Sequence, residues 1–310
     1  MKRVLLLGGY GFISTNLLEY ICNYANDDYK VIIFDYFESH PHGIRFDCVE
    51  KVYSGNFTDE SNLKRIFEEN KIDLVLHFLS STVPTTSSNA IYDVESNLVP
   101  TLKLLDLMLK YNVKDIVYLS SGGAIYGDAL KKVHNEEDAV YPKSSYGVVK
   151  LAIEKYLLSY SEIRGFNTLI LRLSNPFGPF HYNERQGIIN VAIRKALRGE
   201  KFQIWGTGEG VKDYIYIYDV CRIIICLINK GVRTDVLNVA SGHSLSVNEI
   251  IKFIKKEIPS FEFENTKESV VDIQSFELDI TKLRESLGTL KMTDFSLALA
   301  QTIDWQRKNI

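Results

Sequence analysis

The stretch V-L-L-L-G-G-Y-G-F-I-S-T-N-L-L-E-Y, residues 4–20, joins an apolar strand to a helix through a turn rich in glycine. Gly8, Gly9 and Gly11 allow the chain to turn tightly and let backbone amides approach a ligand. The start of the following helix attracts a pyrophosphate through its free amides and its dipole. Ser14 stands where the pattern G-x-x-G-x-x-G has its third glycine, and its small side chain still permits close packing. This stretch predicts the first strand–helix unit of a dinucleotide-binding fold.

Strand-like and helix-like segments alternate over the first half of the chain. Apolar runs such as V-I-I-F at 31–34 and L-I-L-R-L at 169–173 are typical of strands covered on both faces. We expect strands at 4–7, 30–35, 74–78, 115–120 and 168–173, and helices at 12–24, 60–70, 97–111 and 146–161. The alternation predicts an α/β fold, a Rossmann-type doubly wound parallel sheet with a smaller C-terminal α/β lobe.

The pattern changes after Asn175, where glycine, proline and polar residues become common. Further helices are expected at 188–198, 220–229 and 247–257, with strands near 214–217 and 236–239. We therefore expect residues 1–174 to form an NAD-binding domain to which 211–240 returns, and residues 175–210 and 241–310 to form a substrate-binding lobe.

Length and composition limit the possible classes of protein. The 310 residues are 45% hydrophobic and 24% charged, which suits one large globular domain or two moderate ones. The net charge of −3 argues against nucleic acid as a partner. No export signal or membrane-spanning run is recognisable, so we expect a cytoplasmic protein with no membrane partner. The chain has four cysteines, Cys22, Cys48, Cys221 and Cys226. They show no C-x-x-C pair and no zinc-type spacing, which predicts reduced thiols and no metal site.

Asp35 ends the expected strand V-I-I-F-D. A carboxylate at this position can accept hydrogen bonds from both hydroxyls of an adenosine ribose and repels a 2′-phosphate, which favours NAD over NADP. The alternative is that Asp35 only caps a turn or helix.

Tyr146-Gly-Val-Val-Lys150 places a tyrosine and a lysine one helical turn apart on the same face. A free tyrosine has a pKa of about 10. A nearby ammonium and a positive nicotinamide ring would favour the phenolate, so Tyr146 is a candidate general acid/base for an alcohol or ketone. The segment L-S-S-G-G-A-I-Y-G, 119–127, ends the preceding strand. Its small residues leave room for a substrate at the edge of the sheet where ligands bind.

These motifs together resemble those of extended short-chain dehydrogenases/reductases, in particular the NAD-dependent nucleotide-sugar epimerase/dehydratase family that includes UDP-glucose 4-epimerases. The resemblance covers nearly the whole chain. Five further segments carry it: G-N-F-T-D (55–59), L-H-F-L-S-S (76–81), L-R-L-S-N-P-F-G-P (171–179), V-K-D-Y-I-Y-I-Y-D-V (211–220) and L-D-I-T-K-L-R-E-S-L-G (278–288).

The resemblance implies a role for each matching residue. Tyr146 exchanges a proton with a sugar hydroxyl while hydride moves to or from NAD, and Lys150 also binds the nicotinamide ribose. The implied cofactor-binding residues are Gly8, Gly11, Phe12, Ile13, Asp35, Tyr36, Asn56, Phe57, Leu79, Ser80, Ser81, Asn97, Ser120, Tyr146, Lys150 and Leu173. The implied substrate-binding residues are Thr82, Gly122, Tyr146, Asn175 and Lys212.

The catalytic segment departs from the family pattern. The family's third catalytic residue, a serine or threonine, falls on Gly122, so either Ser121 or a water molecule must supply the hydroxyl. We take Ser121 as the third catalytic residue. Gly123 and Ala124 replace the Asp-Glu pair of the family's dehydratases, which disfavours a 4,6-dehydratase and the sugar-acid decarboxylases that need the glutamate. Ala124 also replaces the cysteine of the 3,5-epimerase/reductases that make GDP-fucose.

The expected diphosphate contacts depart as well. Lys212 replaces an arginine, which keeps the charge but loses the bidentate fork. Ser269 replaces a second arginine, and Lys267 is out of register with it. Either the substrate diphosphate is held differently or the substrate is unusual.

Three functions fit this sequence. The first is a 4-epimerase that oxidises a nucleotide-linked sugar at C4 and returns the hydride to the other face. The second is an NAD(P)H-dependent 4-ketoreductase of a nucleotide-linked 4-keto-6-deoxy sugar. The third is a non-catalytic NAD-binding regulatory protein. Polysaccharide biosynthesis is the setting that the resemblance implies. Helices 97–111 and 146–161 are apolar around most of their circumference, which predicts a homodimer built on them.

Overall fold

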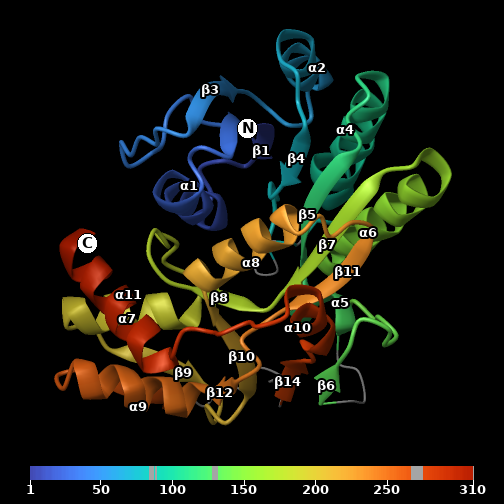
Figure 1. Cartoon of the computed structure of the whole chain (residues 1–310). Coiled ribbons are helices and arrows are strands. Elements are labelled where there is room, and N and C mark those ends of the chain that lie inside the picture. The colour runs from blue at the N-terminus through green and yellow to red at the C-terminus, as the bar shows by residue number, and fades with distance from the viewer. Residues whose placement is uncertain (84–86, 88, 128–131, 267–274, 310) are drawn as a thin grey trace.

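A computed structural model describes residues 1–83, 87, 89–127, 132–266 and 275–309 (Figure 1). Its main body is a seven-stranded parallel sheet in the order β11-β7-β5-β4-β1-β2-β3. The strands are β1 (Lys2–Leu7), β2 (Tyr29–Asp35), β3 (Val49–Ser54), β4 (Leu74–His77), β5 (Asp115–Ser121), β7 (Asn167–Leu173) and β11 (Asp235–Val239). The predicted Rossmann-type α/β fold is confirmed.

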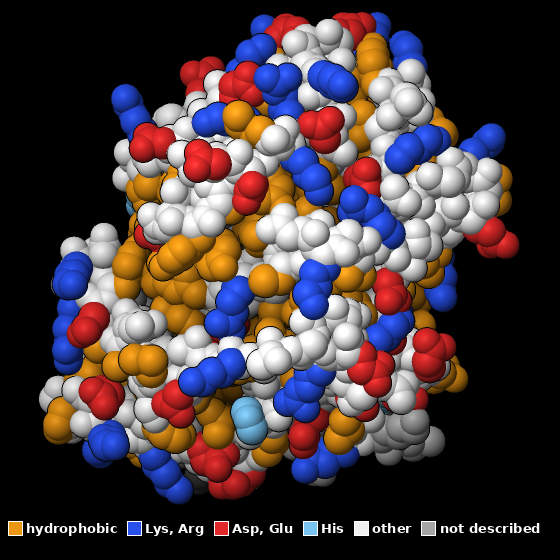
Figure 2. Space-filling model, viewed as in Figure 1, with side chains coloured by type: hydrophobic (Ala, Val, Ile, Leu, Met, Phe, Trp, Pro, Cys, Tyr) orange, Lys and Arg blue, Asp and Glu red, His pale blue; other side chains and the backbone are white. Residues whose placement is uncertain are grey.

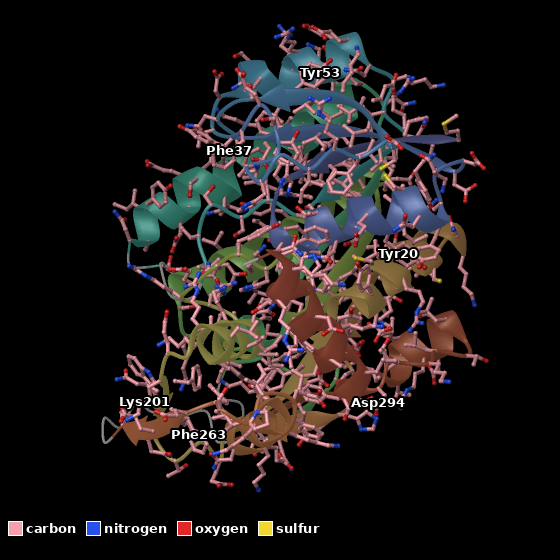
Figure 3. All side chains as sticks on the ribbon, turned by 90° about the vertical axis from the view of Figure 1, so that its left-hand side faces the viewer. Tyr20, Phe37, Tyr53, Lys201, Phe263 and Asp294 are labelled. Atoms are coloured by element: carbon pink, nitrogen blue, oxygen red, sulfur yellow. The ribbon has the colours of Figure 1, made fainter. Side chains whose placement is uncertain are left out.

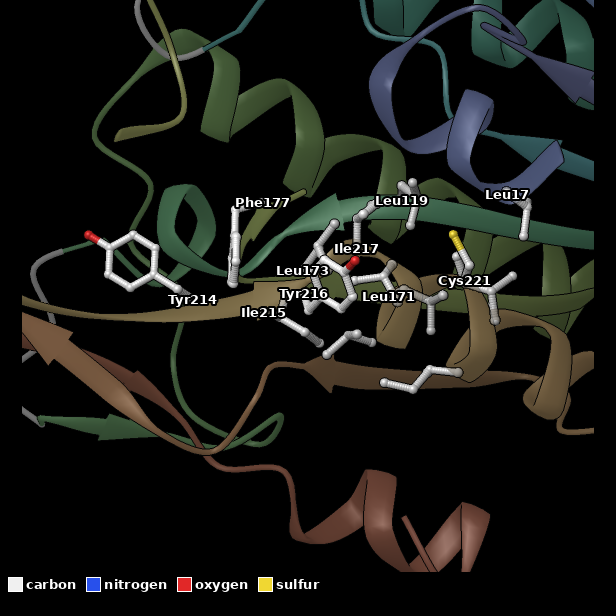
Figure 4. Packing of buried hydrophobic residues seen from close by; sticks show 14 of the residues in the cluster. Leu17, Leu119, Leu171, Leu173, Phe177, Tyr214, Ile215, Tyr216, Ile217 and Cys221 are labelled. Carbon is white, nitrogen blue, oxygen red and sulfur yellow. The ribbon is translucent and has the colours of Figure 1, made fainter. Parts of the chain in front are cut away.

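Helices cover both faces of this sheet. On one face, α1 (Phe12–Tyr24) packs against α8 (Ile217–Asn229), and on the other lie α2 (Glu60–Glu69), α4 (Val99–Lys110) and α6 (Ser145–Arg164). Successive residues of β1 belong alternately to two separate apolar clusters, because side chains of a strand alternate between the two faces of the sheet. Figure 4 shows the first cluster, where side chains from α1, α8 and the sheet interlock.

A smaller sheet lies below the carboxyl ends of the main strands. Its order is β12-β10-β14-β6, and β8 also pairs with β10. The strands are β6 (Val133–His134), β8 (Asn175–Phe177), β10 (Val211–Tyr216), β12 (Ser244–Ser246) and β14 (Ser275–Leu278). A separate pair consists of β9 (Phe202–Trp205) and β13 (Phe263–Thr266). Figure 3 shows this lower lobe with Lys201 and Phe263, far from Tyr53 of β3.

The remaining helices support this lobe and its junction with the main sheet. They are α5 (Gly122–Tyr126), α7 (Ile188–Arg198), α9 (Val247–Glu257), α10 (Thr281–Leu287) and α11 (Phe295–Asn309). The segment 211–240, expected to return to the NAD-binding domain, is divided between the two sheets. Strand β10 belongs to the smaller sheet, and only α8 and β11 pack into the main body. The reason is long-range: β10 takes its partners from 175–177, 244–246 and 275–276.

Two local differences from the sequence prediction have clear causes. The expected helix 97–111 begins earlier, as α3 (Ala90–Asp93), and passes through a π-helical turn, η1 (Val94–Leu98), into α4. Pro100 near the start of α4 has no amide to donate, and the Val99 amide bonds five residues back, to Val94. Strand β3 was not predicted because it is an exposed edge strand and shows no continuous apolar run.

The surface seen in Figure 2 mixes charges of both signs. Its apolar side chains gather in a groove between α1, α8 and α11, lined by Tyr20, Tyr24, Tyr216, Tyr218 and Trp305. Within the described residues, no helix combines the length and apolar character needed to cross a bilayer.

Candidate active site

The glycine turn after β1 has the geometry that close backbone approach requires. Gly8 has φ +76°, and a Cβ there would come within 2.9 Å of the Leu79 Cα. Its amide donates to the Phe34 carbonyl at 2.8 Å, which ties the turn to the end of β2. Gly11 precedes α1 without any side-chain cap, so the first amides of this helix point toward the sheet edge uncapped. Ser14, at the third glycine position, is fully buried.

Asp35 links the glycine turn to the end of β2. Its carboxylate accepts hydrogen bonds from the Tyr10 amide at 2.9 Å and the Phe37 amide at 3.2 Å. These contacts resemble those of a turn cap, and they also fix the carboxylate beside the turn. Tyr36 next to it is exposed, whereas Phe57, after β3, is buried against Phe34.

Asn97 connects the ends of β4 and the π-helical turn. Its Oδ1 accepts the Ser81 amide at 2.8 Å, and its Nδ2 lies 3.5 Å from the Thr82 hydroxyl. Asn97 is itself buried in η1, where the wider π turn directs its side chain toward the segment after β4.

Tyr146 and Lys150 lie in the first turns of α6, which Ser144 caps by accepting the Gly147 amide at 3.1 Å. Lys150 Nζ donates to the Leu119 carbonyl at 2.9 Å and lies 4.8 Å from the ring centre of Tyr118. Burial lowers the pKa of Lys150 to about 8, against the opposing effect of the Glu154 carboxylate. The Leu119 carbonyl and the face of the Tyr118 ring thus hold the Lys150 ammonium in place near Tyr146.

Burial raises the pKa of Tyr146 to about 12, and a hydrogen bond with the Ser121 side chain acts in the opposite direction. Lys150, which the sequence suggested as the group that lowers this pKa, lies 5.7 Å from the centre of the Tyr146 ring. At neutral pH the buried phenol therefore holds its proton and is ready to donate it.

Ser121 ends β5 and caps α5, accepting the Ala124 amide at 3.4 Å. At Gly122, where the family has its hydroxyl residue, an added Cβ would lie 2.6 Å from Leu278 Cδ1 of β14, so a side chain there would require Leu278 to move. Glycine has no hydroxyl, and the side chain that hydrogen-bonds Tyr146 is that of Ser121, one residue earlier. In the register of the main sheet, Leu173 of β7 pairs with Ser121 of β5, and Ser120 is the preceding residue of β5.

One pocket gathers six of the predicted site residues, and Ser121 is not part of its lining. It is lined by His77, Leu79, Ser80, Thr82, Asn97, Tyr118, Tyr146, Val149, Lys150 and Ile153. His77 and Tyr118 were not predicted as site residues. Burial lowers the pKa of His77 to about 3, so this ring stays neutral, and its Nε2 lies 2.8 Å from the Thr101 hydroxyl.

The predicted substrate residues Asn175 and Lys212 lie in the smaller sheet, away from that pocket. Asn175 Nδ2 donates to the Asp213 carbonyl at 2.8 Å, and Lys212 is half-buried in β10. Asp213, which was not predicted, organises this region: its buried carboxylate accepts from Ser174, from Ser241 and from the Gly242 amide. Ser269 and Lys267 lie outside the described residues.

A buried ion pair supports α6, the helix that carries Tyr146 and Lys150. Arg172 Nη2 of β7 lies 2.8 Å from Glu154 Oε2 of α6, and both side chains are almost fully buried. Arg172 also donates to the Tyr126 hydroxyl at 2.9 Å. Glu154 follows Lys150 by one helical turn, and this spacing is the one signal by which the sequence could have revealed it.

The predicted site requires NAD, and the polar groups and backbone around it are suited to bind this cofactor. In the described part of the chain, the buried Ser120 hydroxyl, the Tyr118 hydroxyl and His77 Nδ1 have no hydrogen-bond partner. The glycine turn and the uncapped start of α1 suit a diphosphate, and Asp35 suits a ribose diol.

Comparison with known proteins establishes the class. Residues 4–240 match the NAD dependent epimerase/dehydratase family, and the chain belongs to it. Its cofactor is NAD. The chain is 29% identical to a putative UDP-glucose 4-epimerase of Methanocaldococcus jannaschii, with 99% of each covered. It is 28% identical to a dTDP-D-glucose 4,6-dehydratase of Bos taurus, over 99% of this chain and 89% of that one. The structure of a UDP-glucose 4-epimerase of Thermotoga maritima with UDP-glucose superposes with a TM-score of 0.88, at 29% identity and 99% coverage of both chains.

Proposed function

We propose that the protein is a nucleotide-sugar 4-epimerase that works through a transient 4-keto sugar. The observation that carries this proposal is the contact between Tyr146 and Ser121 at the end of β5, with Lys150 directly behind. Relatives include both epimerases and a dehydratase, so the choice depends on the residues of α5. Gly123 and Ala124 there carry no acid or base, which supports an epimerase over a 4,6-dehydratase.

Each residue has one task in this reaction. Tyr146 takes the proton of the sugar hydroxyl when C4 is oxidised and returns it when C4 is reduced. Ser121 holds the phenol oxygen and polarises the same sugar oxygen. NAD, when bound, would supply the hydride acceptor and donor, and its positive nicotinamide ring would favour the phenolate that burial alone disfavours. Lys150 would hold the nicotinamide ribose.

The principal alternative is a 4-ketoreductase of a nucleotide-linked 4-keto-6-deoxy sugar. One observation supports it: the chain is 27% identical to a dTDP-4-dehydro-6-deoxyglucose reductase of Escherichia coli, over 87% of this chain and 84% of that one. A non-catalytic NAD-binding role is the weakest candidate, because Ser121 hydrogen-bonds Tyr146 and Lys150 Nζ lies 5.7 Å from the centre of the Tyr146 ring.

Absorbance at 340 nm separates the two enzyme functions. Purified protein is mixed with NADH and with UDP- and dTDP-linked sugars, including 4-keto-6-deoxy forms, and products are separated by chromatography. The epimerase is expected to interconvert a sugar pair with no change in NADH. Stoichiometric loss of NADH with a keto sugar would establish the reductase instead. Tyr146→Phe serves as the control and should be inactive in both assays, whereas a wild type that binds NAD but shows neither activity would support the non-catalytic role.

We also propose that the protein is a homodimer through helices 97–111 and 146–161. Apolar side chains are exposed along α3, η1, α4 and α6, including Ile91, Val99, Val148, Tyr156 and Ile163. Such a row on two neighbouring helices suits a helical interface between two copies. Sedimentation at micromolar concentration should give a dimer, and Val148→Glu should give a monomer. A wild type that sediments only as a monomer contradicts this.

A further inference from the structure

Two cysteines that are far apart in the sequence lie in contact in the structure. Cys22 is in the last turns of α1, and Cys48 immediately precedes β3. Their sulfur atoms are 2.7 Å apart, although the residues are separated by 26 positions. This distance lies between an S–S bond of about 2.05 Å and the separation of two sulfurs that merely touch.

The surrounding contacts hold both side chains in this orientation. The Cys48 amide points at the Cys22 sulfur at 3.4 Å, and the Cys48 thiol points at the Leu18 carbonyl of α1 at 3.6 Å. Leu18 precedes Cys22 by one helical turn, so the same face of α1 meets the start of β3 twice. The two sulfurs therefore face each other as part of well-packed structure.

We propose that Cys22 and Cys48 form a reversible disulfide when the protein meets an oxidised low-molecular-weight thiol such as glutathione disulfide. The two sulfurs differ in access: Cys48 is fully buried, whereas Cys22 is half-buried. Cys22 is the sulfur that an external reagent can reach. Structural disulfides of secreted proteins persist because their surroundings are always oxidising, whereas this pair would form its bond only when the surroundings become oxidising.

The exchange proceeds in two balanced steps. The Cys22 thiolate attacks one sulfur of glutathione disulfide, forms a mixed disulfide and releases one glutathione thiolate. The Cys48 thiolate then attacks the Cys22 sulfur, forms the Cys22–Cys48 bond and releases the second glutathione. The two protein thiols lose two protons and two electrons, and glutathione disulfide takes up both. Burial raises the pKa of the Cys48 thiol and so lowers its thiolate fraction, but the 2.7 Å separation from the Cys22 sulfur makes the second step intramolecular and offsets this.

The cross-link would act on stability rather than on chemistry. It closes a loop that contains all of β2, and it lies at the amino end of this strand, whereas Asp35 lies at the carboxyl end. Because the cross-link restricts the unfolded chain while native contacts stay in place, the oxidised protein should unfold at a higher temperature. We expect a rise in Tm of about 5 °C or more.

The test uses the full chain with glutathione disulfide as the probe. After incubation and alkylation of free thiols, peptide mapping should show Cys22 linked to Cys48, no retained glutathione on either, and reversal by dithiothreitol. Cys226→Ser removes an exposed thiol of α8 and should behave like the wild type, with the same gain in Tm. Cys22→Ser should show neither cross-link nor gain.

Two results would overturn the proposal. One is a wild type in which both thiols stay alkylatable under oxidation. The other is a glutathione adduct on Cys22 that Cys48 does not displace. The wild-type mapping decides the matter even if Cys22→Ser folds poorly, and Cys22→Ala provides a second variant for the Tm comparison.

Discussion

The two sheets of this protein position their functional side chains in different ways. In the main sheet, Asp35 and Ser121 are the last residues of parallel strands, and the segment after β4 follows directly on another. In the smaller sheet, Asn175 and Lys212 lie within strands held together by partners far away in the sequence. Parallel strand ends converge on one edge, so chemistry there can be predicted from the sequence. A sheet assembled from distant pieces offers no such guide.

This contrast suggests a division of tasks, in which the main sheet supplies the reaction and the smaller sheet grips the substrate. Four variants test this division, and they are described from the largest expected effect to the smallest.

Tyr146→Phe should have the largest effect. Loss of the proton donor and acceptor is expected to lower kcat by about 10³-fold, while NAD binding changes little. Steady-state kinetics and a binding titration with NAD check the two halves of this statement. Lys150→Met is the comparison, since it should weaken NAD binding as well. Retained turnover in Tyr146→Phe would place the chemistry elsewhere.

Glu154→Gln tests the support behind the main site. It leaves the Arg172 guanidinium buried without its ionic partner, which should lower the free energy of unfolding by about 3–5 kcal/mol. Urea denaturation measures this. Glu69→Gln is the matched control, because its partner Arg65 is at the surface and the change should be slight. Equal effects of both variants would show that burial of the pair is not what matters.

Asp35→Asn should weaken NAD binding by about tenfold or more, because a charged hydrogen-bond acceptor for the ribose is lost. The same variant should reduce the preference for NAD over NADP, which titration with both cofactors measures. If Asp35 served only as a turn cap for Tyr10 and Phe37, stability would fall and the preference would stay.

Lys212→Ala should have the smallest effect of the four variants, and the effect should fall on substrate binding and not on turnover. If the smaller sheet only grips the nucleotide-sugar, KM should rise by about tenfold with kcat nearly unchanged. Lys212→Arg should keep KM near or below the wild-type value, since it offers a bidentate fork. A fall in kcat without a change in KM would contradict the division between the two sheets.

Particular residues show what local patterns in the sequence can indicate. The glycine turn, Asp35 and the Tyr146–Lys150 pair are recognisable because each depends on local spacing beside a strand end, and their roles stay predictions. Edge strand β3 was missed because its side chains are largely exposed, and the start of the helix near Asn97 was misplaced because a π turn precedes Pro100. Asp213 was missed as an organiser because its partners, Ser174, Ser241 and Gly242, are dispersed along the chain.

By itself, the sequence determined the parallel α/β architecture and the residues that meet at its edge, because strand and helix periods and turn residues act over short distances. Only the tertiary structure showed that Ser121, which the sequence suggested as the third catalytic residue, contacts Tyr146, since this contact depends on how α6 packs beside β5. It alone also joined Glu154 to Arg172 and brought Cys22 against Cys48. These contacts depend on how whole elements pack on one another, and no local spacing in the chain records that.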